Sequence, residues 1–458
     1  MYKIKRGFIN NFSLFPIAKF RNSHEKLKNF ESLKIFMNLK FKVGVLLLLL
    51  AVGLIVGIFV TTQVSVTIAY EESDKKAYSV DKDIVASYNS FGLDLLKELW
   101  EEDQGKNIVF SPLSVSLALT MLFNGAENTT KIAMAKVLHF ENKSLERVNE
   151  ESANLTASLE NVDRKVQLHL ANSVWLRKEF DPLVNESFKE RLSKYYKTEM
   201  SSRDFADPAT VNEINDWVSR KTNGKINKVL ERIEPQIVMF LINAIYFKGE
   251  WKVKFDESKT RKGTFYLSNG DEVVVDMMET KGEFKFYFGD DFSVLRLPYG
   301  RDKISMYIFL PDVGSPLNSM MEELTWEKME EVFNNLQGAD EVRVEMPKFS
   351  FRYEKRMNQI LSDLGMSIIF DEWEANFSKI AHLEPSYNLY VEFVDHKAFI
   401  EVNEEGTEAA AATTVGIGIT SVPRTITFTV DHPFLFVIRD DRSGIILFAG
   451  VVEDPTKS

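Results

Sequence analysis

The stretch EVNEEGTEAAAATTVGIGITSVP, residues 401–423, begins at the end of a hydrophobic strand and continues through small, uncharged residues without a turn signal. Alternate residues of a strand lie on opposite faces. One face of this stretch would carry Thr407, Ala409, Ala411, Thr413, Val415, Ile417 and Ile419. The other would carry Glu408, Ala410, Ala412, Thr414, Gly416 and Gly418. Such a segment could enter an existing sheet as a new strand, with its first face on a core and its second toward solvent, and Gly406 would act as a flexible hinge.

Two other interpretations of this stretch are an alanine-rich helix and a flexible tether. The β-branched Thr, Val and Ile residues and the two late glycines, Gly416 and Gly418, disfavour a long helix. A permanently exposed tether would not need two alternating faces. The rest of the sequence has to decide among the three interpretations.

The composition predicts a large acidic globular part. The chain has 458 residues, of which 45% are hydrophobic, and a net charge of −11. Residues 1–36 carry a net charge of +6, and Lys40 and Lys42 add two positive charges, so residues 70–458 carry −19. This balance argues against nucleic acid as a partner of the whole chain.

An unbroken apolar run, VGVLLLLLAVGLIVGIFV (43–60), has a length between that of a signal-peptide core and that of a transmembrane helix. The basic segment MNLKFK, which begins at Met37, precedes the run, and Ala69 follows it at a position suited to cleavage. We predict a non-native upstream extension over 1–36, a signal peptide over 37–69 and a polar mature extension over 70–82. The alternative is an uncleaved signal anchor, and only this alternative would attach the protein to a membrane.

The chain has no cysteine, which excludes thiol catalysis and cysteine-ligated metal sites. A secreted domain without disulfides has to rely on the size of its core. Glycosylation sequons of the mature chain begin at Asn128, Asn142, Asn154, Asn185 and Asn376. We therefore expect a secreted, extracellular glycoprotein.

Hydrophobic periodicity predicts one α+β domain over residues 83–455. Ile84, Tyr88, Phe91, Leu95 and Leu99 recur at helical spacing. A short strand is expected over 108–110, and the Ser-Pro pair at 111–112 is typical of the start of a second helix. Further strands are expected over 166–176, 342–346, 428–437 and 445–452, and a helix over 356–364. Residues 237–247 form a long apolar run, and 211–218 and 226–229 are expected to be helical or short amphipathic pieces.

Six ordered motifs resemble those of the serpin superfamily. They are NIVFSPLSVSLALTML (107–122), INDWVSRKTNGKI (214–226), LINAIYFKGEW (241–251), VEMPKFSF (344–351), DHKAFIEVNEEGTEAAAA (395–412) and DHPFLFVIRDDRSGIILFAGVVEDP (431–455). The GTEAAAATT run is similar to the hinge of the inhibitory members, here of an arthropod-like or other invertebrate secreted type. The resemblance implies three β-sheets, about nine helices and an exposed reactive-centre loop over residues 404–424.

The resemblance also implies a suicide-substrate inhibitor of serine endopeptidases, not an enzyme. In this family a protease attacks the exposed loop and forms an acyl-enzyme, and the cut loop inserts into the central sheet and traps the protease. The scissile bond corresponds to Thr420–Ser421, with Ile419 or Ser421 left open as the residue before the cut. Thr420 is small and uncharged, and Arg424 lies four residues past the bond. Elastase-like, chymotrypsin-like or subtilisin-like targets are therefore expected.

Three groups of residues take roles by this resemblance. The mobile hinge comprises Glu404, Gly406, Thr407, Glu408, Ala409, Ala410, Ala411 and Ala412. Glu404 is expected to form a surface ion pair with Lys348 near Trp251, at the top of the central sheet; two solvated charges are the alternative. Ser111, Ser114, Asn243 and His396 are expected to form one polar cluster beneath this sheet, which could act as a two-state latch.

No cofactor, metal ion or glycosaminoglycan site is implied. Residues 144–162, where some serpins have a basic heparin-binding helix, hold Glu146, Glu150, Glu151 and Glu160 against Arg147. No G-x-S-x-G or H-E-x-x-H motif is present, so a catalytic role for His396 has no support. We expect a monomer whose partner is a target serine protease, bound as a covalent acyl complex. A non-inhibitory serpin that carries a ligand, stores protein or acts as a chaperone is the second interpretation.

Overall fold

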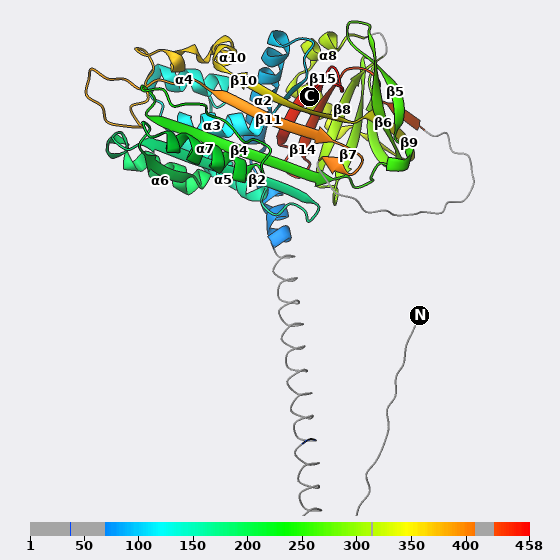
Figure 1. The fold of residues 1–458 in the computed structure, drawn as a ribbon, viewed down its shortest axis with the longest axis horizontal. Helices are drawn as coiled ribbons and strands as arrows, with labels where there is room; N and C mark the ends of the chain where they lie inside the picture. The colour runs from blue at the N-terminus through cyan, green and yellow to red at the C-terminus, as the bar shows by residue number, and fades with distance from the viewer. Residues whose placement is uncertain (1–36, 38–68, 313–314, 408–425) are drawn as a thin grey trace, which may run out of the picture. The chain divides into compact units, whose positions relative to one another are not determined.

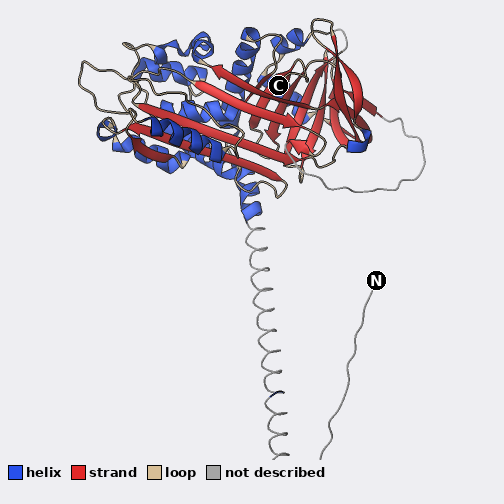
Figure 2. Cartoon of the chain, viewed as in Figure 1, coloured by secondary structure: helices blue, strands red, loops and turns tan. Residues whose placement is uncertain are grey.

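The structure, a computed structural model, describes residues 37, 69–312, 315–407 and 426–458. Residues 69–458 form a unit of their own (Figures 1 and 2). Within the described ranges no helix is long and apolar enough to cross a membrane. Residues 38–68 of the predicted signal segment lie outside the described residues, as do Glu408, Ala409, Ala410, Ala411, Ala412, Thr420 and Ser421.

The first two predicted helices are confirmed, as is the predicted start of the second at Ser111. The side chain of Asp81 accepts a hydrogen bond from the Asp83 N–H at the start of α2 (Lys82–Glu102), and Ser111 caps α3 (Pro112–Phe123) in the same way. The other helices are α4 (Asn128–Val137), α5 (Leu145–Ser158), α6 (Glu186–Tyr196), α7 (Pro208–Lys221), α8 (Leu317–Glu323), α9 (Trp326–Asn334) and α10 (Asn358–Leu361). Short helical turns are η1 (Asp181–Leu183), η2 (Glu257–Lys259), η3 (Ser362–Met366) and η4 (Ser367–Phe370).

One sheet has six strands. Their order is β10 (Phe349–Arg356), β11 (Asp395–Val402), β12 (Gly406–Thr407), β4 (Met239–Glu250), β2 (Val166–Arg177) and β3 (Glu199–Arg203). Helix α7 packs on one face of this sheet, where Ile214 and Trp217 lie in one apolar cluster with Phe240. Ile245 and Phe247 of β4 belong instead to the main core on the other face. The sheet therefore has both faces partly covered, as expected for a central sheet.

The other sheet has nine strands. Their order is β1 (Ile108–Phe110), β15 (Ile446–Val452), β14 (Phe434–Asp440), β8 (Ile304–Pro311), β7 (Phe292–Tyr299), β6 (Glu272–Phe288), β9 (Gln337–Pro347) and β13 (Ile426–Thr429), and β5 (Arg261–Tyr266) also pairs with β6. The predicted α+β architecture is confirmed. Hydrogen bonds join the described strands into two continuous sheets where the resemblance implied three, because β6 is long enough to pair with β7 at one end and with β5 and β9 elsewhere.

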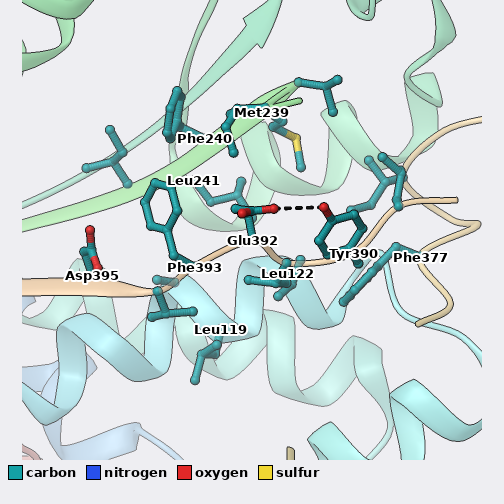
Figure 3. Close-up of a pocket in the computed structure, with 18 of the residues that line it drawn as sticks. Leu119, Leu122, Met239, Phe240, Leu241, Phe377, Tyr390, Glu392, Phe393 and Asp395 are labelled. Carbon is teal, nitrogen blue, oxygen red and sulfur yellow. Dashed lines mark hydrogen bonds between the residues drawn. The ribbon is translucent and has the colours of Figure 1, made fainter. Parts of the chain in front are cut away.

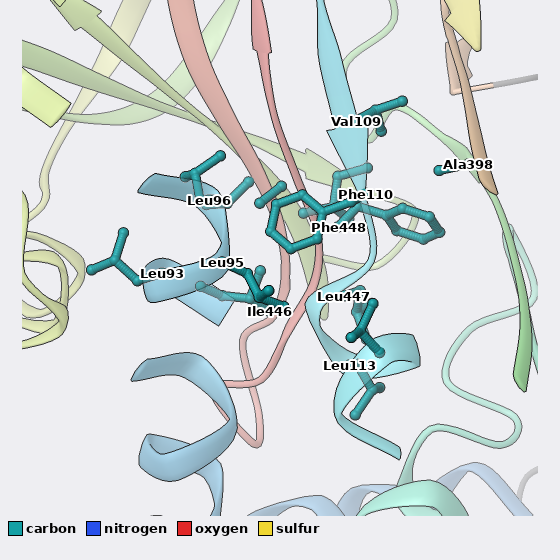
Figure 4. Packing of buried hydrophobic residues seen from close by; sticks show 14 of the residues in the cluster. Leu93, Leu95, Leu96, Val109, Phe110, Leu113, Ala398, Ile446, Leu447 and Phe448 are labelled. Carbon is teal, nitrogen blue, oxygen red and sulfur yellow. The ribbon is translucent and has the colours of Figure 1, made fainter. Parts of the chain in front are cut away.

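One part of the main core lies between α2, α3 and the strands β1 and β15. Figure 4 shows Leu93, Leu95 and Leu96 of α2 in this core, together with Leu113 of α3 and Phe448 of β15. All five side chains are buried. A fully buried Leu or Phe side chain contributes roughly 1.5–3 kcal/mol, so a core of this size can stabilise the domain without disulfides.

Residues 69–79 are helical, although the sequence predicts 70–82 as a polar extension without periodicity. Ser73 and Ala77 are buried at helical spacing. Asp74 accepts hydrogen bonds of 2.6 and 2.7 Å from Lys303 Nζ and one of 2.9 Å from Arg442 Nη1. This segment contacts the domain through charged as well as small side chains. Its sequence therefore lacks the hydrophobic periodicity from which a helix would be predicted.

Two predicted boundaries at the C-terminal half of the chain are wrong. The strand expected over 428–437 is broken into β13 and β14 at residues 430–433, where Pro433 has no N–H for a ladder bond. β13 pairs in parallel with β9, whereas β14 pairs with β8 and β15. The helix expected over 356–364 has its α-helical part only at Asn358–Leu361 and continues in a wider turn, in which Gly365 has φ +105°.

Candidate functional site

The first residues of the predicted loop already form a strand inside the central sheet. Thr407 of β12 lies opposite Val402 of β11 and opposite Gly249 of β4, and Gly406 lies opposite Glu250. The chain therefore enters the sheet between two strands that are distant in sequence. In Figure 1 the ribbon passes at this point from the orange strand β11 into the grey trace.

Gly406 is needed for close packing at this entrance. A Cβ atom on Gly406 would lie 2.0 Å from the carbonyl oxygen of Gly249 and 2.8 Å from the Cα of Glu250. Backbone atoms cannot move aside as a flexible side chain can. The sequence predicts Gly406 as a flexible hinge; the structure instead makes it the point where two backbones approach more closely than any side chain permits.

Thr407 is buried with 5% of its surface exposed, and its hydroxyl shares a hydrogen bond of 2.7 Å with the hydroxyl of Tyr299. The ring of Tyr299 stacks on Trp251, with ring centroids 4.4 Å apart and planes at 12°. Burial raises the pKa of the Tyr299 phenol well above its ordinary value, so this hydroxyl stays protonated. Trp251 also donates from Nε1 to the carbonyl of Asn403 at 2.9 Å, so the aromatic pair holds the strand entrance on two sides.

The structure brings Glu404 and Lys348 together, with Lys348 Nζ 2.6 Å from Glu404 Oε1. The expected surface location is wrong for Glu404, which has 5% of its surface exposed. Thr260 donates a second hydrogen bond of 2.6 Å to the same oxygen. Burial acts to raise the pKa of Glu404, but the bonds from Lys348 and Thr260 lower it below the ordinary value, so the carboxylate is charged. A buried charge has to keep its partners, and this pair therefore fixes the chain just before β12.

The predicted polar cluster is only partly joined by hydrogen bonds. The Ser111 N–H donates to His396 Nε2 at 3.2 Å, and the Ser114 N–H donates to Ser111 Oγ at 3.1 Å. Asn243 does not follow the prediction: its Nδ2 donates to Asn172 Oδ1 at 2.7 Å. These two asparagines are direct cross-strand neighbours on β4 and β2, which explains the pairing.

The Oδ1 atom of Asn243 is buried and has no hydrogen-bond partner among the described residues. A buried polar atom without a hydrogen bond lowers the free energy of unfolding by roughly 1–3 kcal/mol. Ser114, Asn243 and His396 all line one cavity, so the structure does gather them around a shared space. A polar group that enters this space could satisfy Asn243.

This cavity has a volume of about 870 Å³ and lies between β4 and residues 387–397, with α3 beneath it. Figure 3 shows Leu119 and Leu122 of α3 on one side and Met239, Phe240 and Leu241 of β4 on the other. Every residue of β4 from Met239 to Ile245 lines it, from both faces of the strand. The cavity is therefore bounded by the edge of the strand, where backbone groups face a neighbour.

His396→Gln is expected to remove a pH dependence of stability. Burial lowers the pKa of His396 to about 4, whereas the unfolded chain titrates near the ordinary value of about 6.5. Between these pH values the unfolded state binds the extra proton. The free energy of unfolding should thus fall as pH drops from about 6.5 to about 4, by on the order of 3 kcal/mol. Denaturant unfolding at pH 7 and pH 4.5 measures this loss.

The exposed His382 offers the control, since His382→Gln should keep the dependence on pH. If His396→Gln loses as much stability between the two pH values as the unaltered protein, this account of the buried imidazole is wrong.

The five sequons differ in their accessibility. Asn128, Asn142 and Asn154 are exposed, whereas Asn185 and Asn376 are half-buried. Asn185 Nδ2, the atom that would carry a glycan, donates hydrogen bonds to the carbonyls of Ser378 and Lys379. Three of the predicted sites are thus open to modification, and modification of Asn185 would break existing bonds.

The chain is similar to known proteins over nearly all of the described domain. A family model described as Serpin (serine protease inhibitor) matches residues 86–455. An uncharacterized serpin-like protein of Methanosarcina acetivorans is 34% identical, over 85% of this chain and 92% of that protein. The crystal structure of the thermophilic serpin tengpin in its native state has a TM-score of 0.75 at 32% identity, covering 82% of this chain and 95% of that one. Thyroxine-binding globulin in complex with thyroxine has a TM-score of 0.72 at 27% identity, covering 82% and 99%.

Proposed function

The chain belongs to the serpin family, and we propose that it is a suicide-substrate inhibitor that traps serine proteases by inserting its cut loop between β4 and β11. The single observation that carries this proposal is the position of β12. β12 has only two residues and lies between two long strands, β4 and β11. Both neighbours continue past it with further backbone N–H and C=O groups that a longer strand could pair. Continuation of β12 into the cavity would pair them.

The register of β12 predicts where each loop residue would lie after insertion. Thr407 is opposite Gly249 and Val402, and both pairings are antiparallel. Each further loop residue then moves back by one residue along both neighbours. Thr413 would lie between Asn243 and His396, and Ile417 would lie between Met239 and Glu392.

The chemistry of the loop fits this register. The core-facing residues nearest the entrance, Ala409 and Ala411, would lie beside the large Phe247 and Ile245. Val415 and Ile417 would enter the apolar cavity. The Thr413 hydroxyl would come opposite Asn243, where it could donate to the unpaired Oδ1. Small residues therefore meet the crowded part of the sheet and apolar residues meet the open part.

The proposal extends to target and compartment. The scissile bond is Thr420–Ser421, and its uncharged residues favour elastase-like, chymotrypsin-like or subtilisin-like proteases. The protein is exported by the segment 37–69, acts as a secreted monomer and carries glycans on the exposed sequons. It is not an enzyme, and its partner is the protease that it acylates.

The second candidate is a non-inhibitory serpin that carries a ligand. It is favoured by the cavity of about 870 Å³ and by the similarity to thyroxine-binding globulin, which holds thyroxine in its solved structure. The two candidates differ in what loop cleavage does. An inhibitor should become much more resistant to heat once its loop is cut, because the new strand fills the sheet, whereas a carrier should not.

The unaltered protein, residues 70–458, is expected to form an SDS-resistant complex with at least one of four proteases: elastase-like, chymotrypsin-like, subtilisin-like and trypsin-like. The first three should react and the trypsin-like one should not. The mass of the released C-terminal peptide should correspond to a start at Ser421. Cleavage by all of them without any complex would sink the inhibitor and leave the carrier.

A further inference from the structure

Two strongly exposed aromatic side chains lie on two turns that are fastened to each other. Trp373 has 80% of its surface exposed and Tyr387 has 71%. Asn388 Nδ2, next to Tyr387, donates to the carbonyl of Ala375 at 2.8 Å. Asp371 Oδ1 accepts from the N–H of Trp373 at 2.8 Å. Both rings are thus presented from fixed backbone, so binding through them would cost little ordering of the chain.

The surroundings of these rings are acidic. The exposed carboxylates on the same two turns and on the segment that leads to β11 are Asp371, Glu372, Glu374, Glu384 and Glu392. The nearby Lys379 is paired with Glu127 at 2.8 Å. We call Trp373, Tyr387 and these five carboxylates the acidic aromatic patch. A basic protein surface suits it, because an Arg guanidinium stacks on an aromatic face and pairs with a carboxylate.

The patch lies at the far end of the cavity from the strand entrance. Tyr387, Glu384 and Glu392 line the cavity, next to Met239 at the start of β4. The entrance, at Gly249, is at the other end of this strand of twelve residues. At about 3.3 Å per residue, the two ends are roughly 36 Å apart.

The insertion register connects the patch to the reaction. Continued by three residues past Ile417, it brings Thr420 between Gln236 and Leu389. Leu389 is two residues from Tyr387. A protease whose serine is esterified to the Thr420 carbonyl would therefore move with the inserting loop along β4. After insertion it would lie beside the patch.

We propose that the acidic aromatic patch binds the basic surface of the trapped protease and so prolongs the life of the covalent complex. This inference rests on the proposed function. Release needs hydrolysis of the ester: water gives its hydroxyl to the Thr420 carbonyl carbon and its proton to the protease serine. Contacts that hold the protease against the patch oppose its return to a geometry that can perform this step. Trp and Tyr at the centre of such a contact carry a large share of the binding energy.

Trp373→Ala and Tyr387→Ala are the test variants, and Tyr78→Ala, an aromatic with 68% of its surface exposed elsewhere, is the matched control. Each is reacted with the protease that forms a complex with the unaltered protein, and free protease is removed. Recovery of protease activity and appearance of cleaved inhibitor are then followed. The double variant should release active protease roughly tenfold faster, the factor that corresponds to about 1.4 kcal/mol. Its rate of association should not change, since the patch lies at the other end of β4 from Thr407, the last described residue before the loop.

The carboxylates of the acidic aromatic patch provide a second test, again measured as the lifetime of the covalent complex. Glu372→Lys with Glu374→Lys should also shorten the life of the complex, and added salt should shorten it for the unaltered protein more than for this variant. Equal lifetimes for the unaltered protein and the aromatic double variant overturn the inference while leaving the inhibitor intact, because complexes still form. Cleavage of the unaltered protein without any complex overturns the proposed function as well.

Discussion

Thr407→Arg is expected to turn the proposed inhibitor into a substrate that the protease cuts and releases. Thr407 has 5% of its surface exposed and lies between β11 and β4, with its hydroxyl bonded to Tyr299. An arginine there would place a charge beside the Tyr299 hydroxyl in the core, which costs more than the roughly 2–7 kcal/mol of an unpaired neutral polar group. This cost should draw β12 of the uncut variant out of the sheet, so strand entry after cleavage would have to bury the charge again. Since about 1.4 kcal/mol changes a rate tenfold, strand entry would slow by more than tenfold and hydrolysis of the acyl-enzyme would be faster.

Gel electrophoresis in SDS and the number of inhibitor molecules consumed per protease measure this change. The complex should fall below detection while cleavage at the loop continues. Thr407→Ser is the control, because it keeps the hydroxyl that Tyr299 contacts and should still trap. A stable complex formed by Thr407→Arg would show that the chain does not insert through this position.

Val415→Lys should abolish trapping, whereas Thr414→Lys, one residue earlier, should largely preserve it. In the register set by β12, Val415 would enter the cavity between Leu241 and Val394, where a lysine would be buried among mostly apolar side chains. The carboxylate of Glu392, two residues from Val394, already accepts hydrogen bonds from Tyr390 and Gln236. Thr414 would lie on the other face, opposite Asp395, which is exposed and could pair with the new lysine. The two variants carry the same charge and differ only in the face of the strand.

The measurement is the yield of SDS-resistant complex for the two variants, with loop cleavage as proof that each is still attacked. Equal yields would contradict the register and the alternation of faces on which it depends. The reverse order, with Thr414→Lys inactive, would mean that the inserted strand is displaced by one residue.

The sequence predicted those parts of the fold that depend on local pattern. The spacing from Ile84 to Leu99 and the Ser-Pro pair at 111–112 led directly to α2 and α3. The resemblance correctly paired Glu404 with Lys348, but it could not give the burial of Glu404, which depends on Thr260 closing over it. The burial of a residue depends on all the segments that pack around it, and a local sequence pattern does not contain this information.

Cross-strand partners were the main part of the site that sequence reasoning missed. Tyr299 and Asn172 contact predicted site residues, yet each is separated from its partner by many residues, and its contact depends on strand register. Asn172 offered one available signal, since a polar residue within an apolar strand needs a partner. Tyr299 offered none, because its position at the end of β7 is suited to an ordinary core residue.

The helix formed by residues 69–79 decides where this chain can be shortened. The side chain of Arg442 has 2% of its surface exposed, and its charge is shared by Asp440 and Asp74. A recombinant protein that begins at Asp83, the start of the domain by sequence pattern, would lack Asp74 and Ser73 and would leave this arginine with half of its neutralising charge. Loss of one partner from a buried ion pair costs on the order of 3–5 kcal/mol, a large fraction of the stability of a typical domain. Truncations meant to isolate the folded domain should therefore begin no later than Ala69 or Tyr70.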